Sequence, residues 1–111
     1  MKLIIAIVQD DDSARLVNAL MKEGFGVTKL ATTGGFLRAG NTTLLIGVDD
    51  EKLQPAMGII EHVCKSRKHV SAAPMNMPGM GTMHAAATYP VEVTVGGATV
   101  FVLPVEQFVK L

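Results

Sequence analysis

The stretch Lys2-Leu3-Ile4-Ile5-Ala6-Ile7-Val8-Gln9 is a continuous apolar run, and it ends abruptly at the acids Asp10-Asp11-Asp12. A short run of this kind is typical of a strand that is buried in a sheet. It is too short to span a membrane. It also lacks a small-residue cleavage site at the place where a signal peptide would have one, so we expect a cytoplasmic protein.

Two amphipathic helices are expected further along the chain. The first is predicted over residues 13–23, with its N-cap among residues 11–13 and Gly24 as its C-terminal cap. The second is predicted to begin after residues 49–50 and to end near Arg67. Each has an apolar face at helical spacing, made by Leu16, Val17, Leu20 and Met21 in the first and by Leu53, Met57, Ile60 and Cys64 in the second.

Four more strands are predicted, over residues 27–33, 41–48, 89–95 and 98–103, and Gly96-Gly97 is a hairpin turn signal between the last two. The element order is strand-helix-strand-strand-helix-loop-strand-strand. It predicts an α+β fold, a ferredoxin-like split β-α-β sandwich with both helices on one face of the sheet. The final hairpin is then an extra C-terminal element. The length of 111 residues fits one domain.

Residues 68–88 show no period that would bury their apolar side chains. The segment contains residues that interrupt helices and strands, namely Pro74, Pro78, Gly79 and Gly81. It also contains four methionines, Met75, Met77, Met80 and Met83. We predict a long mobile loop, and a loop of this length inside a small domain is usually functional or disordered.

Composition excludes several classes of protein. The ten basic and ten acidic residues give a formal net charge of zero, which disfavours non-specific binding to DNA or RNA. The single cysteine, Cys64, cannot form an internal disulfide, and its place on an apolar helix face indicates a core residue rather than a nucleophile. The core is expected to be aliphatic, because Trp is absent and aromatic residues are few.

Residues 28–43, TKLATTGGFLRAGNTT, combine small hydroxyl residues, adjacent glycines, two cations and an aromatic residue. Glycines let backbone N–H groups approach an anion closely, and Lys29 and Arg38 are able to neutralise phosphate charge. Phe36 is suited to stack on a base, and Asn41 to bind a base edge. This set fits a nucleotide pocket. An ordinary glycine-containing hairpin loop explains the same residues, and neither a P-loop nor a dinucleotide fingerprint is present.

Residues 31–43, ATTGGFLRAGNTT, resemble the signature of the PII-like cyclic di-AMP receptor family. The segments IIAIVQD at 4–10, YPVEV at 89–93 and VGGATVFVLPV at 95–105 are similar to that family as well. Together the resemblance covers roughly residues 1–50 and 89–108.

The resemblance implies a PII-like second-messenger receptor rather than an enzyme. Such a receptor is a homotrimer of ferredoxin-like subunits that holds one cyclic di-AMP in each cleft between neighbours, without another cofactor or a metal. Rearrangement of loops near the cleft relays the signal to a downstream protein; membranes and nucleic-acid polymers are not expected partners. The positions that match the family's ligand contacts are Thr28, Gly35, Phe36, Leu37, Asn41 and Gly47.

The chain departs from the family pattern at the start of the second strand. Typical receptors carry Asn and Arg there on either side of a Phe, whereas this chain has Gly24 and Gly26 around Phe25. An arginine supplies a planar cation that stacks on adenine or hydrogen-bonds to it. Its absence predicts weaker binding of cyclic di-AMP or a different nucleotide ligand.

Three other hypotheses remain open from the residues alone. The Met-rich segment with His84 offers soft ligands of the kind that bind Cu(I), although spacings of this kind arise by chance in a chain with seven Met. His62, His69 and His84 are too scattered for a zinc site. A nucleotide-hydrolysing enzyme lacks an identifiable general base, and a purely structural interaction module would leave residues 34–38 without a ligand.

Overall fold

The computed structural model describes residues 1–30, 40–74 and 88–111. The chain divides into two units, the first made of Met1–Lys65 with Gly96–Leu111 and the second of Ser66–Val95.

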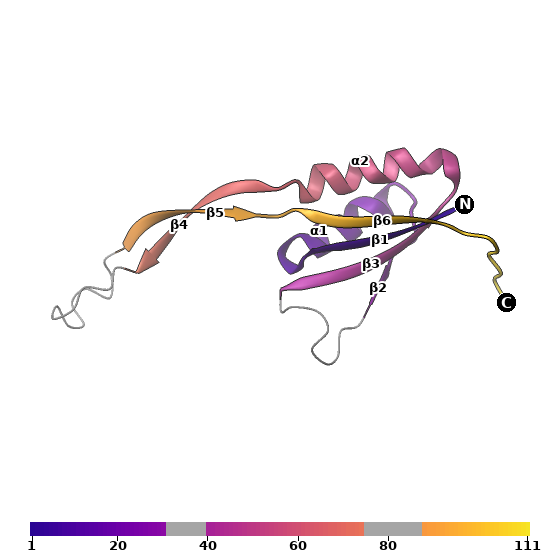
Figure 1. Ribbon diagram of the computed structural model, residues 1–111, viewed down its shortest axis with the longest axis horizontal. Coiled ribbons are helices and arrows are strands. Elements are labelled where there is room, and N and C mark those ends of the chain that lie inside the picture. Colours follow the sequence, from indigo (N-terminus) through magenta and orange to yellow (C-terminus); the bar gives the residue numbers. More distant parts are fainter. Residues whose placement is uncertain (31–39, 75–87) are drawn as a thin grey trace. The chain divides into compact units, whose positions relative to one another are not determined.

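The first unit is built on a four-stranded antiparallel sheet (Figure 1). The strand order is β2-β3-β1-β6, with β1 spanning Lys2–Gln9, β2 Thr28–Lys29, β3 Asn41–Val48 and β6 Ala98–Pro104. The central strand β1 pairs along its length with β3 on one side and with β6 on the other. This arrangement confirms the predicted ferredoxin-like split β-α-β fold, and the predicted bounds of β1 and β3 match the observed strands.

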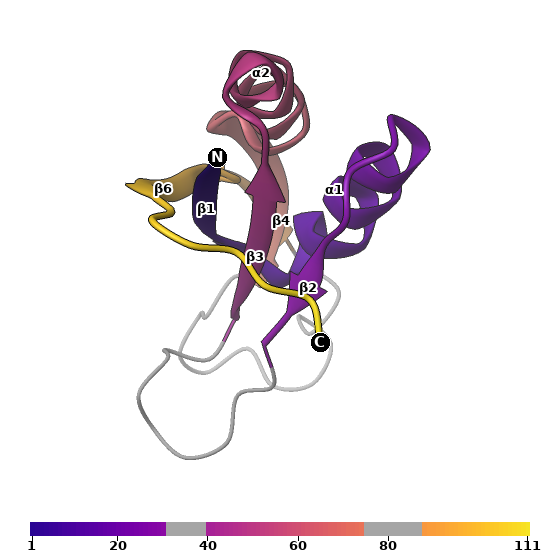
Figure 2. The same ribbon diagram turned by 90° about the vertical axis from the view of Figure 1, so that its right-hand side faces the viewer.

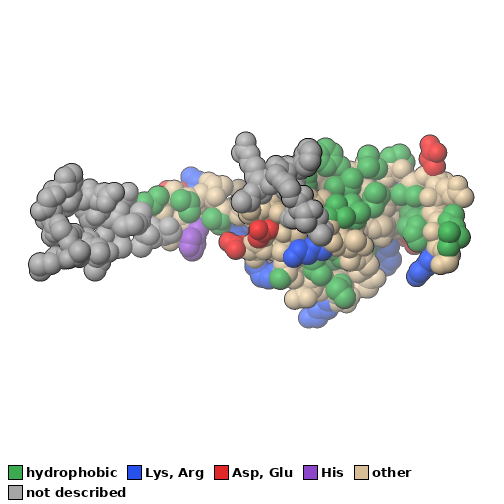
Figure 3. Space-filling view, turned by 90° about the horizontal axis from the view of Figure 1, so that it is seen from below, with side chains coloured by type: hydrophobic (Ala, Val, Ile, Leu, Met, Phe, Trp, Pro, Cys, Tyr) green, Lys and Arg blue, Asp and Glu red, His purple; other side chains and the backbone are tan. Residues whose placement is uncertain are grey.

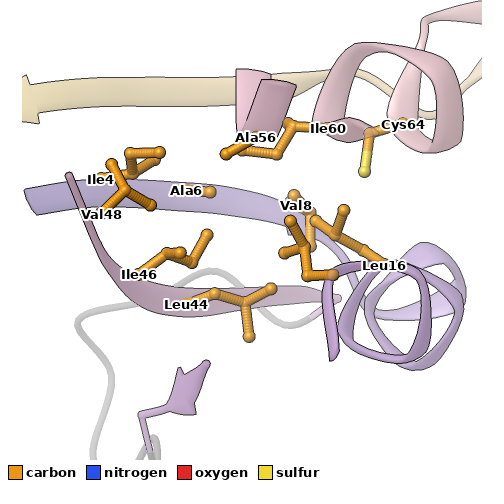
Figure 4. Close-up of a cluster of buried hydrophobic side chains, with 11 residues drawn as sticks. Ile4, Ala6, Val8, Leu16, Leu44, Ile46, Val48, Ala56, Ile60 and Cys64 are labelled. Atoms are coloured by element: carbon orange, nitrogen blue, oxygen red, sulfur yellow. The ribbon is translucent and has the colours of Figure 1, made fainter. Parts of the chain in front are cut away.

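Both helices lie on one side of this sheet (Figure 2). Helix α1 spans Asp10–Lys22, and helix α2 spans Leu53–Cys64 directly after the short 3-10 helix η1, Asp50–Lys52. Ile60 and Cys64 of α2 and Leu16 of α1 point into the core against β1 and β3 (Figure 4). The core is aliphatic as predicted, and its buried members are Ile4, Ala6, Val8, Leu16, Leu20, Leu44, Ile46, Val48, Ala56, Ile60 and Cys64.

The side of the sheet away from the helices carries a second set of apolar side chains. Successive side chains of β1 point to opposite sides of the sheet, and those on the side away from the helices are only half-buried. In register with Ile5 stand Leu45 on β3 and Phe101 on β6, and Phe101 is 52% exposed. We call this surface the open face; its apolar residues are Leu3, Ile5, Ile7, Leu45, Phe101 and Leu103. Figure 3 shows hydrophobic side chains gathered on part of this surface.

The second unit is an antiparallel ribbon of β4, Arg67–Pro74, and β5, Thr88–Val95. The prediction of a loop over residues 68–88 is therefore wrong for residues 68–74 and 88, while residues 75–87 lie outside the described part. The ribbon carries an ion pair between Lys68 Nζ and Glu92 Oε1 at 3.2 Å. Strand β4 escapes sequence prediction because the side chains of residues 67–70 are all exposed, so no alternation of buried and exposed residues marks the start of the strand.

The predicted hairpin between residues 89–95 and 98–103 is also wrong. Strand β5 pairs with β4, whereas β6 pairs with β1 in the other sheet. The extra hairpin is thus inserted between α2 and the last strand of the sandwich rather than added at the C-terminus. Gly96 and Gly97 have φ of +82° and +92°, and Gly97 N–H donates a hydrogen bond to Cys64 O instead of closing a turn.

Helix boundaries differ from expectation by a few residues. Helix α1 begins at Asp10, one turn before the predicted start, so Asp12 and Ser13 are buried within its first turns rather than capping it. Acids in a first turn are favourable because they face the positive end of the helix dipole. Helix α2 ends at Cys64 rather than near Arg67, because the chain enters the ribbon there.

Candidate functional site

Three of the expected ligand contacts share the open face of the sheet. Thr28 pairs with Leu45 of the open face, and strand alternation puts Asn41 and Gly47 of β3 on that side too. Asn41 and Gly47 stand at opposite ends of the strand, so the shared surface is about 20 Å long. That length suits an extended ligand rather than a single small group.

Gly47 provides close access to the backbone on this surface. A Cβ at Gly47 would lie 3.3 Å from Met1 Cε, which is a tight contact. A side chain at this position would cover the backbone of the strand, and the end of the Met1 side chain would have to shift slightly to admit it. Gly47 is exposed, so a bound molecule can approach the main chain of β3 here.

Lys29 lies on the other side of the sheet from Thr28. It pairs with Leu44, a core residue of the helix-covered side, and its own side chain is exposed at the sheet edge. A direct phosphate contact by Lys29 and a base contact by Thr28 therefore involve opposite sides of β2. The remaining predicted site residues, Gly35, Phe36, Leu37 and Arg38, lie outside the described residues.

Polar groups collect where β1 ends and β3 begins. Gln9 and Asn41 are direct cross-strand neighbours, and Gln9 Oε1 accepts a hydrogen bond of 2.8 Å from Gly96 N–H. Together with the start of β6 they line an open pocket of about 360 Å³. Its lining residues are Ile7, Val8, Gln9, Asn41, Gly96, Gly97, Ala98 and Thr99.

Hydrogen bonds hold the β1–β3 end of this pocket. Asp10 N–H donates to Gly40 O at 2.8 Å, and the Thr42 hydroxyl donates to Asp10 Oδ1. These bonds tie the first residue of α1 to the residues that lead into β3. Because Gly40 has φ of +101°, a conformation that favours glycine, the chain can turn sharply into β3 beside Asn41.

The departure from the family pattern falls at the end of α1. Gly24 has φ of +89° after the helix, and its N–H donates to Met21 O. Phe25 packs against the core and lines a second pocket of about 260 Å³ together with Glu23, Lys52, Pro55 and Ile59. No atom lies within 4 Å of the position that a Cβ would take at Gly26.

The N-terminal ammonium pairs with an exposed carboxylate. Met1 N lies 3.0 Å from Asp50 Oδ1, and the hydrogen bond and charge of this ammonium lower the pKa of Asp50 below 3.8. Val105 N–H donates to Met1 O, so the N-terminus is held at two points beside Gly47.

The described part of the chain contains no group of three or more His, Cys, Asp or Glu residues placed to hold a metal ion. Cys64 is buried in the core, as predicted, and His62 and His69 are exposed. The Met-rich residues 75–83 and His84 lie outside the described residues.

Sequence reasoning missed Gln9, Thr99 and the two glycines as neighbours of Asn41. Gln9 carried a weak signal, because it is a polar residue directly after an apolar strand. Gly96 and Gly97 are far from Gln9 along the chain, so only the pairing of β6 with β1 brings them to it.

Neither helix in the described residues is long and apolar enough to cross a membrane.

Comparison with known proteins places the chain among relatives. A solved structure of a protein of unknown function from Pediococcus pentosaceus ATCC 25745 is 41% identical in sequence, with a TM-score of 0.76. That match covers 99% of this chain and 96% of the other. A family model described as cyclic-di-AMP receptor matches residues 1–111. The chain therefore belongs to the cyclic-di-AMP receptor family, whose members are PII-like.

Proposed function

We propose that this protein is a cytoplasmic, homotrimeric receptor that binds one cyclic di-AMP at each interface between subunits and relays its presence to a partner protein. The family match over all 111 residues carries the proposal. The common face of Thr28, Asn41 and Gly47 supports it, because side-chain and backbone groups there are available to one extended ligand.

The apolar open face supports assembly of copies. Phe101 and Leu103 are 52% and 44% exposed, and they continue the half-buried row of β1. Association of subunits through this face removes apolar surface from water at about 25 cal/mol per Å². A ligand at the edge of such an interface meets groups from two subunits at once.

Signal relay is proposed to act through residues 68–88, a segment that includes most of β4 and the first residue of β5. Ligand binding can shift the population of this segment only if the ligand binds its alternative arrangements with different affinity. The downstream partner is then a protein that distinguishes these arrangements.

The experiment that tests the proposal is calorimetric titration of the purified protein with cyclic di-AMP, with cyclic di-GMP as control. We expect one site per subunit, and light scattering on the same sample should give the mass of a trimer. Absence of heat with cyclic di-AMP would contradict the receptor function, and a monomer that still binds would contradict only the interface site.

A different nucleotide is the second candidate ligand, and Gly24 and Gly26 favour it because the expected Asn and Arg are missing. A thermal-shift screen of nucleotides tests this candidate. A ligand present at 100 times its Kd should add about 2.7 kcal/mol of stability, so the preferred nucleotide gives the largest shift at equal concentration.

A further inference from the structure

The pocket between β1, β3 and β6 has the size of a site for part of a dinucleotide. Its volume of about 360 Å³ lies near the lower end of the range for ligand pockets. Asn41, one of the expected ligand contacts, lines it, and Gln9 and Thr99 add two polar side chains from the neighbouring strands. By register, Gln9, Asn41 and Thr99 all belong to the side of the sheet that carries Thr28 and Gly47.

The orientation of the Gln9 carboxamide follows from its hydrogen bond to the main chain. A backbone N–H can only donate, so the atom that faces Gly96 N–H is the oxygen, Oε1. Gln9 can therefore donate hydrogen bonds from the two N–H groups of Nε2 to a molecule in the pocket. Their natural partner is an acceptor such as a ring nitrogen of a base.

The chemistry of the lining favours an adenine base over a phosphate or a guanine. No Lys, Arg, Asp or Glu is among the described residues that line the pocket, so these residues supply no charge with which to hold a phosphate. The carboxamide of Asn41 can pair with the N6 and N7 edge of adenine, whereas the O6 and N7 acceptors of guanine favour Arg or Lys. Ile7 supplies apolar surface for the face of a base.

We infer that this pocket holds one adenine of the ligand, with the Nε2 group of Gln9 as a hydrogen-bond donor and the Thr99 hydroxyl as a second contact beside Asn41. The inference rests on the proposed function and assigns two contact residues to it. Because Gln9 also holds Gly96, it connects the occupied pocket with the residue that follows β5 of the ribbon.

The test is titration of Gln9→Glu with cyclic di-AMP. Glutamate keeps an oxygen to accept from Gly96 N–H and has the same shape, but it lacks the two donors. We expect cyclic di-AMP to bind about tenfold more weakly. Because glutamate keeps the acceptor for Gly96 N–H, a purely structural role of Gln9 predicts an unchanged affinity. Gln54→Glu on the exposed side of α2 is the matched control for the added charge and should bind as the wild type does.

Thr99→Val provides a second, uncharged variant at an exposed position of β6, where valine suits the strand. It should weaken binding by about threefold to tenfold through loss of the hydroxyl. If both variants bound cyclic di-AMP with the affinity of the wild type, the adenine site would be overturned and the receptor function would stand. Failure of the wild type to bind cyclic di-AMP would overturn both.

Discussion

At Gly26 a side chain would extend into open space, because no atom lies within 4 Å of the position of its Cβ. Gly26→Arg restores the cation that typical members of the family are expected to carry there. The guanidinium can stack on adenine or hydrogen-bond to it, so we predict that the Kd for cyclic di-AMP falls about tenfold. Titration calorimetry of the two proteins measures the change.

Gly58→Arg is the matched control for this gain of affinity. Gly58 is exposed on α2 and also has no atom within 4 Å of a Cβ, so the variant carries the same added charge away from the predicted contacts. Equal affinities of Gly26→Arg and Gly58→Arg would show that position 26 does not contact the ligand in this protein.

Asp50 gives a pH dependence to stability. The Met1 ammonium lowers the pKa of Asp50 in the folded state. The ionised carboxylate therefore stabilises the fold at neutral pH, and this stabilisation is lost as the pH falls through the lowered pKa. We predict that Asp50→Asn has a slightly lower Tm than the wild type at neutral pH, and that the difference disappears in acid. Thermal melts across the acid range measure this.

The exposed neighbour Asp49 supplies the control for this effect. Asp49→Asn removes the same charge but leaves the ion pair of Asp50 with Met1 in place. A Tm difference for Asp50→Asn that stayed constant into acid would argue against the ion pair as its cause.

Helix α2 and the junction into β6 use glycine in opposite ways. Gly58 lies within α2 with room for a methyl group, so Gly58→Ala should stabilise the protein by about 0.5–1 kcal/mol. Gly97 has φ of +92°, so Gly97→Ala should destabilise it by about 1–2 kcal/mol. Urea denaturation of both variants measures the two free energies of unfolding, and the same sign for both would contradict this account.

At the scale of the whole molecule, the open face is predicted to hold the trimer together. Phe101→Glu places a charged side chain on the open face, in register with Ile5 and Leu45. Subunits that associate through this face would have to bury that charge, which is unfavourable. We expect this variant to dissociate on light scattering and to lose cyclic di-AMP binding with the interface.

Met21→Glu on α1 is the comparison for that variant, because Met21 is 60% exposed and lies outside the open face. It should keep the assembly of the wild type. A trimer that survived Phe101→Glu would place the subunit interface elsewhere.

The sequence pattern determined the helices and the longer strands of the sandwich. Each of them has one buried side, so its apolar residues recur at the period of a helix or a strand. The run of β1 and the strand β3 were predicted with their observed bounds, and the face of α2 that includes Ile60 and Cys64 is buried as expected. Resemblance to the family supplied Thr28, Asn41 and Gly47 as candidate contacts.

Only the tertiary structure decided which strands pair and which side chains meet. The Gly96-Gly97 pair has the local signal of a hairpin, but the pairing of β6 with β1 competes with it, and that pairing joins residues far apart in the chain. For the same reason the sequence did not reveal that Gln9 holds Gly96 beside Asn41, or that Lys29 and Thr28 face opposite sides of the sheet. A local sequence pattern shows which side of one helix or strand is buried. A binding site depends instead on contacts between elements that are far apart in the chain, and no local pattern encodes those contacts.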